Sequence, residues 1–184
     1  VEPVIDAAIG TRDGATIVAF VTSGRTLRLW TTGGIVTLDE NVQPGLSLSS
    51  DGRRVAYARG TAPELDVFIA QSDGSGVVVV ASHPAADYLP AFTPEGDLVI
   101  TSGRDGQPGL WRVRGQIVTR ITPAVASNDT VGLRRLMTPD GRQPPSVGAR
   151  AIAFFDGGGV VVLSHQGKLV GRVDGGRHFR WRTP

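Results

Sequence analysis

The chain contains no cysteine among its 184 residues, which excludes disulfide bonds and metal sites built on thiolates. It also has no run of eighteen apolar residues, so the sequence offers no segment that would cross a membrane as a helix. No segment keeps an apolar stripe at the helical period of 3.6 residues, and we therefore expect no long helix. Lysine is nearly absent as well, because Lys168 is the only one.

The charge balance argues against a nucleic-acid partner. The formal net charge is only +2, and the arginines are dispersed along the chain apart from a group near residues 177–182. Binding to a phosphate backbone requires cations concentrated on one face. We therefore expect no nucleic acid to bind, and we interpret the preference for arginine as the bias of a GC-rich genome.

Glycine and proline, in contrast, are abundant. The chain has 25 glycines and 12 prolines, too many for a helical protein but suited to a chain that turns often between short strands. About 40% of the residues are hydrophobic, which is typical of a globular protein with a sizeable core. This composition predicts an all-β fold.

One sequence pattern recurs along the chain: a predicted strand, a tight turn of an acidic residue followed by glycine, and another apolar strand. The acidic residues of these turns are separated by 38, 44 and 45 positions. They are Asp13, Asp51, Glu95 and Asp140. Thr-Pro pairs at residues 93–94, 138–139 and 183–184 keep the same interval of 45. Because glycine readily adopts the positive φ that tight hairpins need, the pattern predicts a hairpin in each repeat.

Each repeat also holds enough apolar runs for four short strands. In the first repeat, the last three of these runs are residues 16–21, 27–30 and 35–38. In the second repeat, they are residues 54–58, 66–70 and 77–80. Four strands per repeat of about 40–45 residues is the period of a β-propeller blade. We predict one propeller domain over residues 1–184, with blades at about 4–44, 45–89, 90–132 and 133–177, and a further strand starting in 178–184.

The fourth repeat departs from this pattern. Residues 142–148 contain Pro144 and Pro145, which have no amide donor for a central strand, so we expect an insertion loop before the blade resumes at Ala151. Both ends of the chain carry the same phase of the repeat, and the first residue is Val1 rather than methionine. These observations favour a segment of a larger propeller, or a chain from which residues were removed. A closed ring of four blades is the alternative.

The repeat resembles a known family. Residues 49–57 (Ser-Ser-Asp-Gly-Arg-Arg-Val-Ala-Tyr), 66–76, 90–96 and 104–113 are similar to the WD40-like repeat of TolB-type propellers. Such repeats occur in periplasmic proteins, in lipoproteins and in the gating propellers of oligopeptidases. The resemblance implies binding of a protein or peptide at a blade face or in the central channel. It implies no catalysis and no cofactor.

The residues themselves also offer no catalytic or metal site. Ser47 lacks the glycine context of a hydrolase nucleophile and is predicted to lie in a strand. His83, His165 and His178 have no second histidine at the spacing of metal ligands, and His83 is expected in a loop. The repeated carboxylates are predicted to be turn residues, and Asp87 to cap a turn. No metal ligand or catalytic residue is therefore predicted.

These observations favour a non-catalytic propeller that binds a protein or peptide outside the cytoplasm, in a bacterial envelope assembly. Two alternatives stay open: the regulatory propeller of a peptidase or hydrolase whose catalytic domain lies outside this chain, and an accessory subunit of a large complex. Trp30 and Trp111 are expected to fill the space between sheets. The candidate partner-binding residues are Tyr88, Arg104, Arg134, Arg135 and Trp181, the last as an exposed aromatic anchor.

Overall fold

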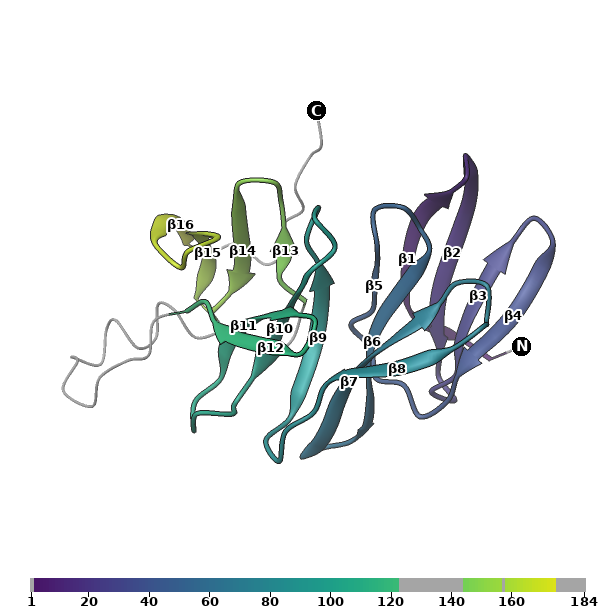
Figure 1. Cartoon of the computed structure of the whole chain (residues 1–184), viewed down its shortest axis with the longest axis horizontal. Coiled ribbons are helices and arrows are strands. Elements are labelled where there is room, and N and C mark those ends of the chain that lie inside the picture. Colours follow the sequence, from purple (N-terminus) through teal and green to yellow (C-terminus); the bar gives the residue numbers. More distant parts are fainter. Residues whose placement is uncertain (1, 123–143, 157, 175–184) are drawn as a thin grey trace.

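Every regular element of the protein is a β-strand in the residues that the structure describes. The computed structural model describes residues 2–122, 144–156 and 158–174. Within these ranges the strands form four four-stranded antiparallel sheets, which we number I to IV in chain order (Figure 1). This arrangement confirms the predicted all-β fold of about four four-stranded propeller blades.

The first two sheets each follow the chain from their first strand to their last. Sheet I contains β1 (Val4–Arg12), β2 (Ala15–Thr22), β3 (Leu27–Thr31) and β4 (Gly34–Asp39). Sheet II contains β5 (Ser47–Leu48), β6 (Arg54–Thr61), β7 (Glu64–Gln71) and β8 (Val77–Ala81). Ser47 thus lies in a strand, as the sequence predicts.

The other two sheets keep the same order but differ in detail from the sequence prediction. Sheet III contains β9 (Asp87–Phe92), β10 (Leu98–Ser102), β11 (Gly109–Arg114) and β12 (Ile117–Arg120), and sheet IV contains β13 (Ser146–Val147), β14 (Ala151–Phe155), β15 (Gly159–Ser164) and β16 (Leu169–Asp174). Residues 87–89 thus belong to the third sheet. Ser146 and Val147, expected in an insertion loop, pair with β14 because both follow the two prolines and keep their amides.

The acidic-glycine turns at Asp13 and Asp51 are both hairpins, but they differ in length. Asp13 and Gly14 form a two-residue turn with φ of 51° and 80°, as predicted. The turn at Asp51 is longer, because the amide of Ser49 bonds to the carbonyl of Arg54 across it. There the Asp51 carboxylate accepts hydrogen bonds from the Ser49 hydroxyl (2.6 Å) and the Arg53 amide (3.0 Å). These bonds confirm Asp51 as a turn residue, whereas Asp140 and the fourth turn lie outside the described residues.

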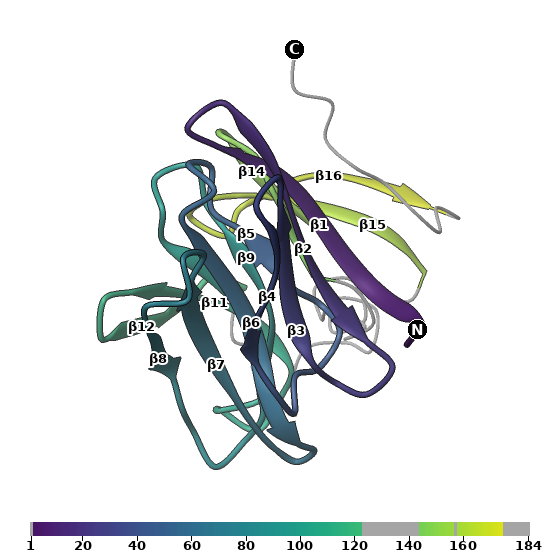
Figure 2. The same cartoon turned by 90° about the vertical axis from the view of Figure 1, so that its right-hand side faces the viewer.

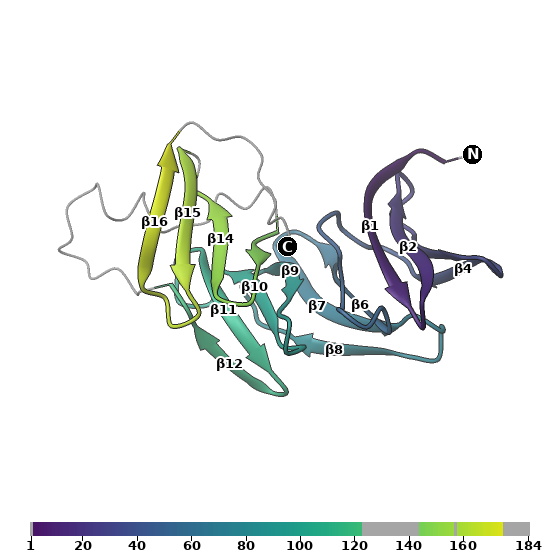
Figure 3. The ribbon, with the colours of Figure 1, turned by 90° about the horizontal axis from the view of Figure 1, so that it is seen from above.

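The sheets succeed one another in an arc, with the first strand of each sheet next to the first strand of the following one (Figure 3). Side chains on these strands join neighbouring sheets to each other. Asp6 on β1 accepts hydrogen bonds from the amides of Gly45 (2.7 Å) and Leu46 (3.1 Å), which lead into sheet II. Ser47 on β5 accepts one from the amide of Phe92 on β9 (3.1 Å). A short polar side chain therefore links each of the first two sheets to its successor.

Apolar layers fill the spaces between the sheets. Ile17, Ala19 and Val21 alternate along β2 and pack against Val55 and Tyr57 of sheet II. Comparable buried clusters lie between sheets II and III and between sheets III and IV. Because a middle sheet has a neighbour on each face, its strands are apolar on both faces rather than alternating, which the sequence indicated.

The far face of sheet I, turned away from sheet II, carries a row of apolar side chains, of which Ile9, Trp30 and Ile35 are exposed. Ile9, Val18, Trp30 and Ile35 pair across the four strands in one row, and Trp30 is 38% exposed. Trp111 occupies the matching position of sheet III and packs against the cluster between sheets II and III. The expectation that both tryptophans fill an intersheet space is thus confirmed for Trp111 and wrong for Trp30 within the described chain.

Candidate partner-binding surface

The antiparallel order of the strands places the turns of the sheets at two opposite ends of the arc. The turns between the first and second strands, and between the third and fourth strands, lie at one end, which we call the AB end. The turns between the second and third strands lie at the opposite end, together with the connections between sheets, and we call this the BC end. Loops that a rigid scaffold holds in place are where propellers and other folds carry binding residues.

The structure brings two of the five candidate binding residues together at the BC end. Tyr88 lies near the start of β9 and Arg104 in the β10–β11 turn, and both side chains are partly buried. Tyr88 pairs with Thr101 across the sheet, next to the pair formed by Asp87 and Ser102. Arg134, Arg135 and Trp181 lie outside the described residues.

Arg104 is held by a buried carboxylate. Its guanidinium lies 2.5 Å from Oδ2 of Asp87, a side chain with no exposed surface, and only 14% of the Arg104 side chain is exposed. The Ser102 hydroxyl also accepts from the Arg104 backbone amide and from its Nε, both at 3.3 Å. Asp87 therefore holds a guanidinium rather than capping a turn, which corrects the sequence interpretation. The charge of Arg104 is compensated within the protein.

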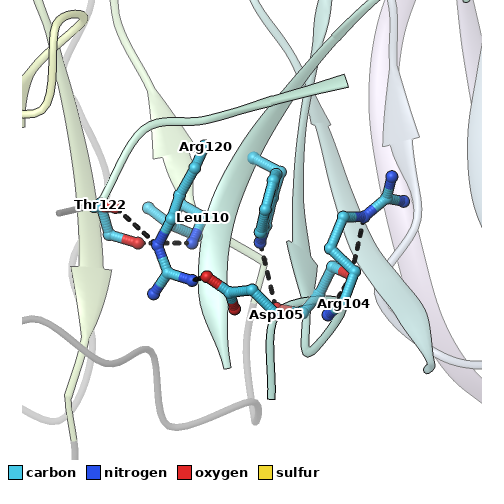
Figure 4. A network of polar contacts seen from close by, with 7 residues as sticks. Arg104, Asp105, Leu110, Arg120 and Thr122 are labelled. Carbon is cyan, nitrogen blue, oxygen red and sulfur yellow. Dashed lines mark hydrogen bonds and ion pairs between the residues drawn. The ribbon is translucent and has the colours of Figure 1, made fainter. Parts of the chain in front are cut away.

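A second arginine completes the network around Trp111 (Figure 4). The guanidinium carbons of Arg104 and Arg120 lie 5.4 and 5.5 Å from the centre of a Trp111 ring, within cation–π range. The Trp111 indole N–H donates to the Ser102 carbonyl at 3.2 Å. Two guanidinium groups thus contact one indole, which fixes the end of the sheet.

Arg120 has its own partners. It forms an ion pair with Asp105 and donates from Nε to the Thr122 carbonyl at 2.7 Å (Figure 4). Burial lowers the pKa of Arg120 from its ordinary value, in keeping with a side chain that is only 14% exposed. A Cβ on Gly109 would lie 2.8 Å from the Arg120 guanidinium and 2.8 Å from the Thr122 hydroxyl, so a glycine makes room for this arrangement.

A related network joins sheets I and II at the BC end. The Tyr57 hydroxyl donates to Oδ2 of Asp39 at 2.6 Å, and Arg59 reaches the same oxygen at 2.9 Å. Arg59 also lies 3.7 Å from the centre of the Phe68 ring. Burial, followed by the hydrogen bond to Asp39, raises the pKa of Tyr57 above its ordinary value. Tyr57 therefore stays protonated and acts as a donor between the sheets.

The AB end contains a polar pocket of about 280 Å³ between sheets I and II, with Arg12 and Arg53 in its lining. Sequence reasoning did not identify these two arginines, although both lie beside the recurrent acidic-glycine turns. That position was a usable signal, because equivalent turns of neighbouring blades meet at the same end of a propeller. The contact between the two sheets, however, cannot be read from either turn alone.

The described residues show no arrangement suited to metal chemistry or membrane crossing. Within residues 2–122, 144–156 and 158–174, no group of three His, Asp or Glu side chains is placed to hold a metal ion. The same ranges contain no helix long and apolar enough to span a bilayer. His83 accepts a hydrogen bond from the amide of Ala85 in the connection before β9, which confirms its loop position. His165 bonds to Arg112 and to the Gly148 carbonyl, both at 2.9 Å, and so joins sheets III and IV.

Comparison with solved structures shows the fold of TolB-type β-propellers. A TolB protein from Agrobacterium tumefaciens matches 88% of this chain with a TM-score of 0.66 and 18% identity, and the chain spans 63% of it. The propeller-containing structure of a nidogen–laminin complex matches 94% of the chain (TM-score 0.54, 14% identity, 80% of that chain). A puromycin hydrolase matches 94% (TM-score 0.60, 16% identity, 31% of that chain). No family model and no curated protein sequence matches the chain.

Proposed function

We propose that the chain is a non-catalytic β-propeller segment that binds a protein or peptide partner. The observation that supports this function most directly is the arc of four blades, which is similar to blades of TolB-type propellers over 88% of the chain. A solved structure of similar fold is itself part of a protein–protein complex, that of nidogen with laminin. The proposal includes no catalytic residue, no cofactor and no nucleic acid partner.

The partner surface in this proposal is the BC end of sheet III. Tyr88 supplies an aromatic side chain there, of the type enriched in binding hot spots. Arg104 supplies the exposed part of its guanidinium. Asp87 and Trp111 hold this group in position before a partner binds. A side chain ordered before binding loses less conformational entropy when the partner arrives. Arg134, Arg135 and Trp181 belong to the proposed surface by sequence alone.

The compartment in this proposal is extracytoplasmic, in the envelope of a bacterium. The support is the resemblance of the repeat to TolB-type propellers, together with the similarity of the fold to TolB structures. Secretion tests this part: a fusion of the native gene to alkaline phosphatase, which is active only after export, should be active. An inactive fusion of normal abundance contradicts it.

Affinity capture of the full native protein, followed by binding assays with the purified partner, tests the function. We expect one stoichiometric protein partner, and we expect Tyr88→Ala combined with Arg134→Ala and Arg135→Ala to weaken its binding at least about tenfold. Lys168→Ala is the matched control, because Lys168 is exposed in a turn at the AB end. Unchanged affinity in the triple variant contradicts the assigned surface, and the absence of any partner contradicts the function.

A second candidate is the regulatory propeller of a peptidase or hydrolase. It is favoured by the similarity to the puromycin hydrolase, of which this chain spans only 31%. In this case a catalytic domain would lie on the same polypeptide or on a bound subunit. The intact mass of the captured protein, combined with a peptidase assay of the captured material, distinguishes this candidate from a binding module.

A further inference from the structure

The polar pocket at the AB end is built from turns of two neighbouring sheets. It is lined by Arg12, Asp13, Arg53, Gln71, Ser72 and Asp73. These residues come from the β1–β2 turn, the β5–β6 turn and the β7–β8 turn, which lie side by side (Figure 2). The pocket is open to solvent and lies at the opposite end of the arc from Tyr88 and Arg104, so it is a separate site.

The walls of the pocket are fixed before any ligand arrives. The Ser72 amide donates to the carbonyl of Arg53 at 2.9 Å, which joins the two turns of sheet II. Arg53 forms an ion pair with Asp13 at 2.5 Å, which joins sheet II to sheet I. Gly52 approaches the Thr11 carbonyl so closely that a Cβ would lie 2.2 Å from the oxygen. The two sheets therefore cannot separate here without breaking several contacts.

Arg12 is the cation of this pocket whose guanidinium keeps N–H donors available for a ligand. Its NH1 donates to the hydroxyl of Ser72 at 3.0 Å, and Ser72 is itself buried. Among the described residues Arg12 forms no ion pair, whereas Arg53 is paired with Asp13. A guanidinium carries five N–H donors in a planar fork, and this fork matches the two oxygens of a carboxylate. Ser72 orients that fork and leaves most of its donors available.

The other charges of the pocket decide which anions it accepts. Asp13 and Asp73 balance the two arginines, so the pocket has no net charge. A hydrogen bond from Ser75, with a smaller contribution from the charge of Arg12, lowers the pKa of Asp73, which is therefore ionised at neutral pH. Two carboxylates repel a phosphate dianion or a polyanion more than they repel a single carboxylate. They also attract an amino or guanidinium group beside that carboxylate, as in a peptide of mixed charge.

We propose that this pocket binds a carboxylate group of a peptide chain, with Arg12 as the guanidinium that pairs with it. The carboxylate can be an acidic side chain or a C-terminus, because both present the same two oxygens. Ser72 is a positioning residue that holds the fork toward the pocket. The proposal does not depend on the partner surface at Tyr88, and the failure of one leaves the other standing.

Titration of the ¹⁵N-labelled protein with blocked tripeptides tests the proposal by NMR. The probes are acetyl-Ala-Glu-Ala-amide, which has an acidic side chain, and acetyl-Ala-Ala-Ala with a free C-terminus. We expect one or both to shift the Arg12 Nε–H and Ser72 amide signals saturably, with a Kd on the order of 1–10 mM for so small a ligand. Which of them binds identifies the source of the carboxylate. Acetyl-Ala-Gln-Ala-amide should cause no saturable shift.

Matched variants separate Arg12 from a general effect of charge. Arg12→Gln should weaken binding at least about tenfold, because it removes the charged fork. Arg114→Gln, at an exposed arginine of sheet III, should leave binding unchanged. If Arg12→Gln did not fold, Arg12→Lys would replace it, since lysine keeps the charge but loses the fork. The proposal is overturned if the glutamine peptide binds equally well, if the Arg12 variant keeps full affinity, or if inorganic phosphate binds more tightly than either carboxylate peptide.

Discussion

At the scale of single residues, the pair of Asp87 and Arg104 shows how a buried charge depends on its partner. Asp87 has no exposed surface and Arg104 lies 2.5 Å away. We predict that Arg104→Met destabilises the fold by about 3 kcal/mol, because it leaves a buried carboxylate without its cation. The double variant with Asp87→Leu should recover much of that loss, since no buried charge then remains. Urea unfolding followed by circular dichroism measures both.

Arg114 provides the control for this prediction. Its side chain is 67% exposed in its pair with Asp97, so Arg114→Met should change the free energy of unfolding by less than about 1 kcal/mol. Equal losses for the Arg104 and Arg114 variants would show that burial of the ion pair has no energetic consequence. Failure of the double variant to recover would instead point to Trp111, which loses one of its two guanidinium contacts in both.

A second prediction at this scale concerns alkaline pH. Tyr57 has a pKa raised above its ordinary value of 10.0, mainly by burial, so the folded state favours the protonated phenol. The resulting stability is fully present below pH 10 and decreases as the pH rises above it, because the unfolded state releases its proton first. Tyr57→Phe should therefore flatten the dependence of unfolding free energy on pH between about 10 and 11. An unchanged slope in the variant would assign the dependence to other groups.

At the scale of turns and strands, Gly52 shows how one residue joins two sheets. Its φ is 68°, and a Cβ would lie 2.2 Å from the Thr11 carbonyl oxygen in sheet I. Gly74 has a φ of 80° with nothing near the site of a Cβ. Gly74→Ala should thus cost about 1 kcal/mol for backbone strain alone, whereas Gly52→Ala should cost about 3 kcal/mol or more because the sheets must move apart. Thermal or urea unfolding of the two variants makes the comparison, and equal losses would contradict a close approach at Gly52.

The same turns explain which features could be predicted from sequence. An acidic residue followed by glycine is a local signal, since the positive φ of a tight turn depends on the residues of that turn alone. The repeat, the four-stranded blades and the turn role of Asp51 could therefore be inferred. The contact of Arg104 with Asp87, in contrast, depends on the register of β9 against β10, which includes an irregularity between Val99 and Thr101. The pocket around Arg12 also depends on two sheets meeting: Arg12 and Arg53 each lie beside an acidic-glycine turn, but neither turn alone shows that the two come into contact.

At the scale of the whole molecule, Trp30 and Trp111, which occupy matching positions in sheets I and III, differ in whether a neighbouring sheet covers them. Trp111 lies between sheets II and III in contact with two arginines, whereas Trp30 is 38% exposed on the far face of sheet I. We predict that Trp111→Gln destabilises the protein by about 3 kcal/mol, because it opens a cavity and removes the cation–π contacts of both guanidinium groups. Trp30→Gln should change the free energy of unfolding by less than about 1 kcal/mol, since a polar residue at an exposed site leaves no cavity. Urea unfolding of both variants at several protein concentrations measures these effects. Trp30→Gln could instead lower the free energy of unfolding as much as Trp111→Gln, by an amount that grows with protein concentration. The far face of sheet I would then be covered by another copy of the chain in solution. A loss of the same size at every protein concentration would mean that residues of the same chain cover this face.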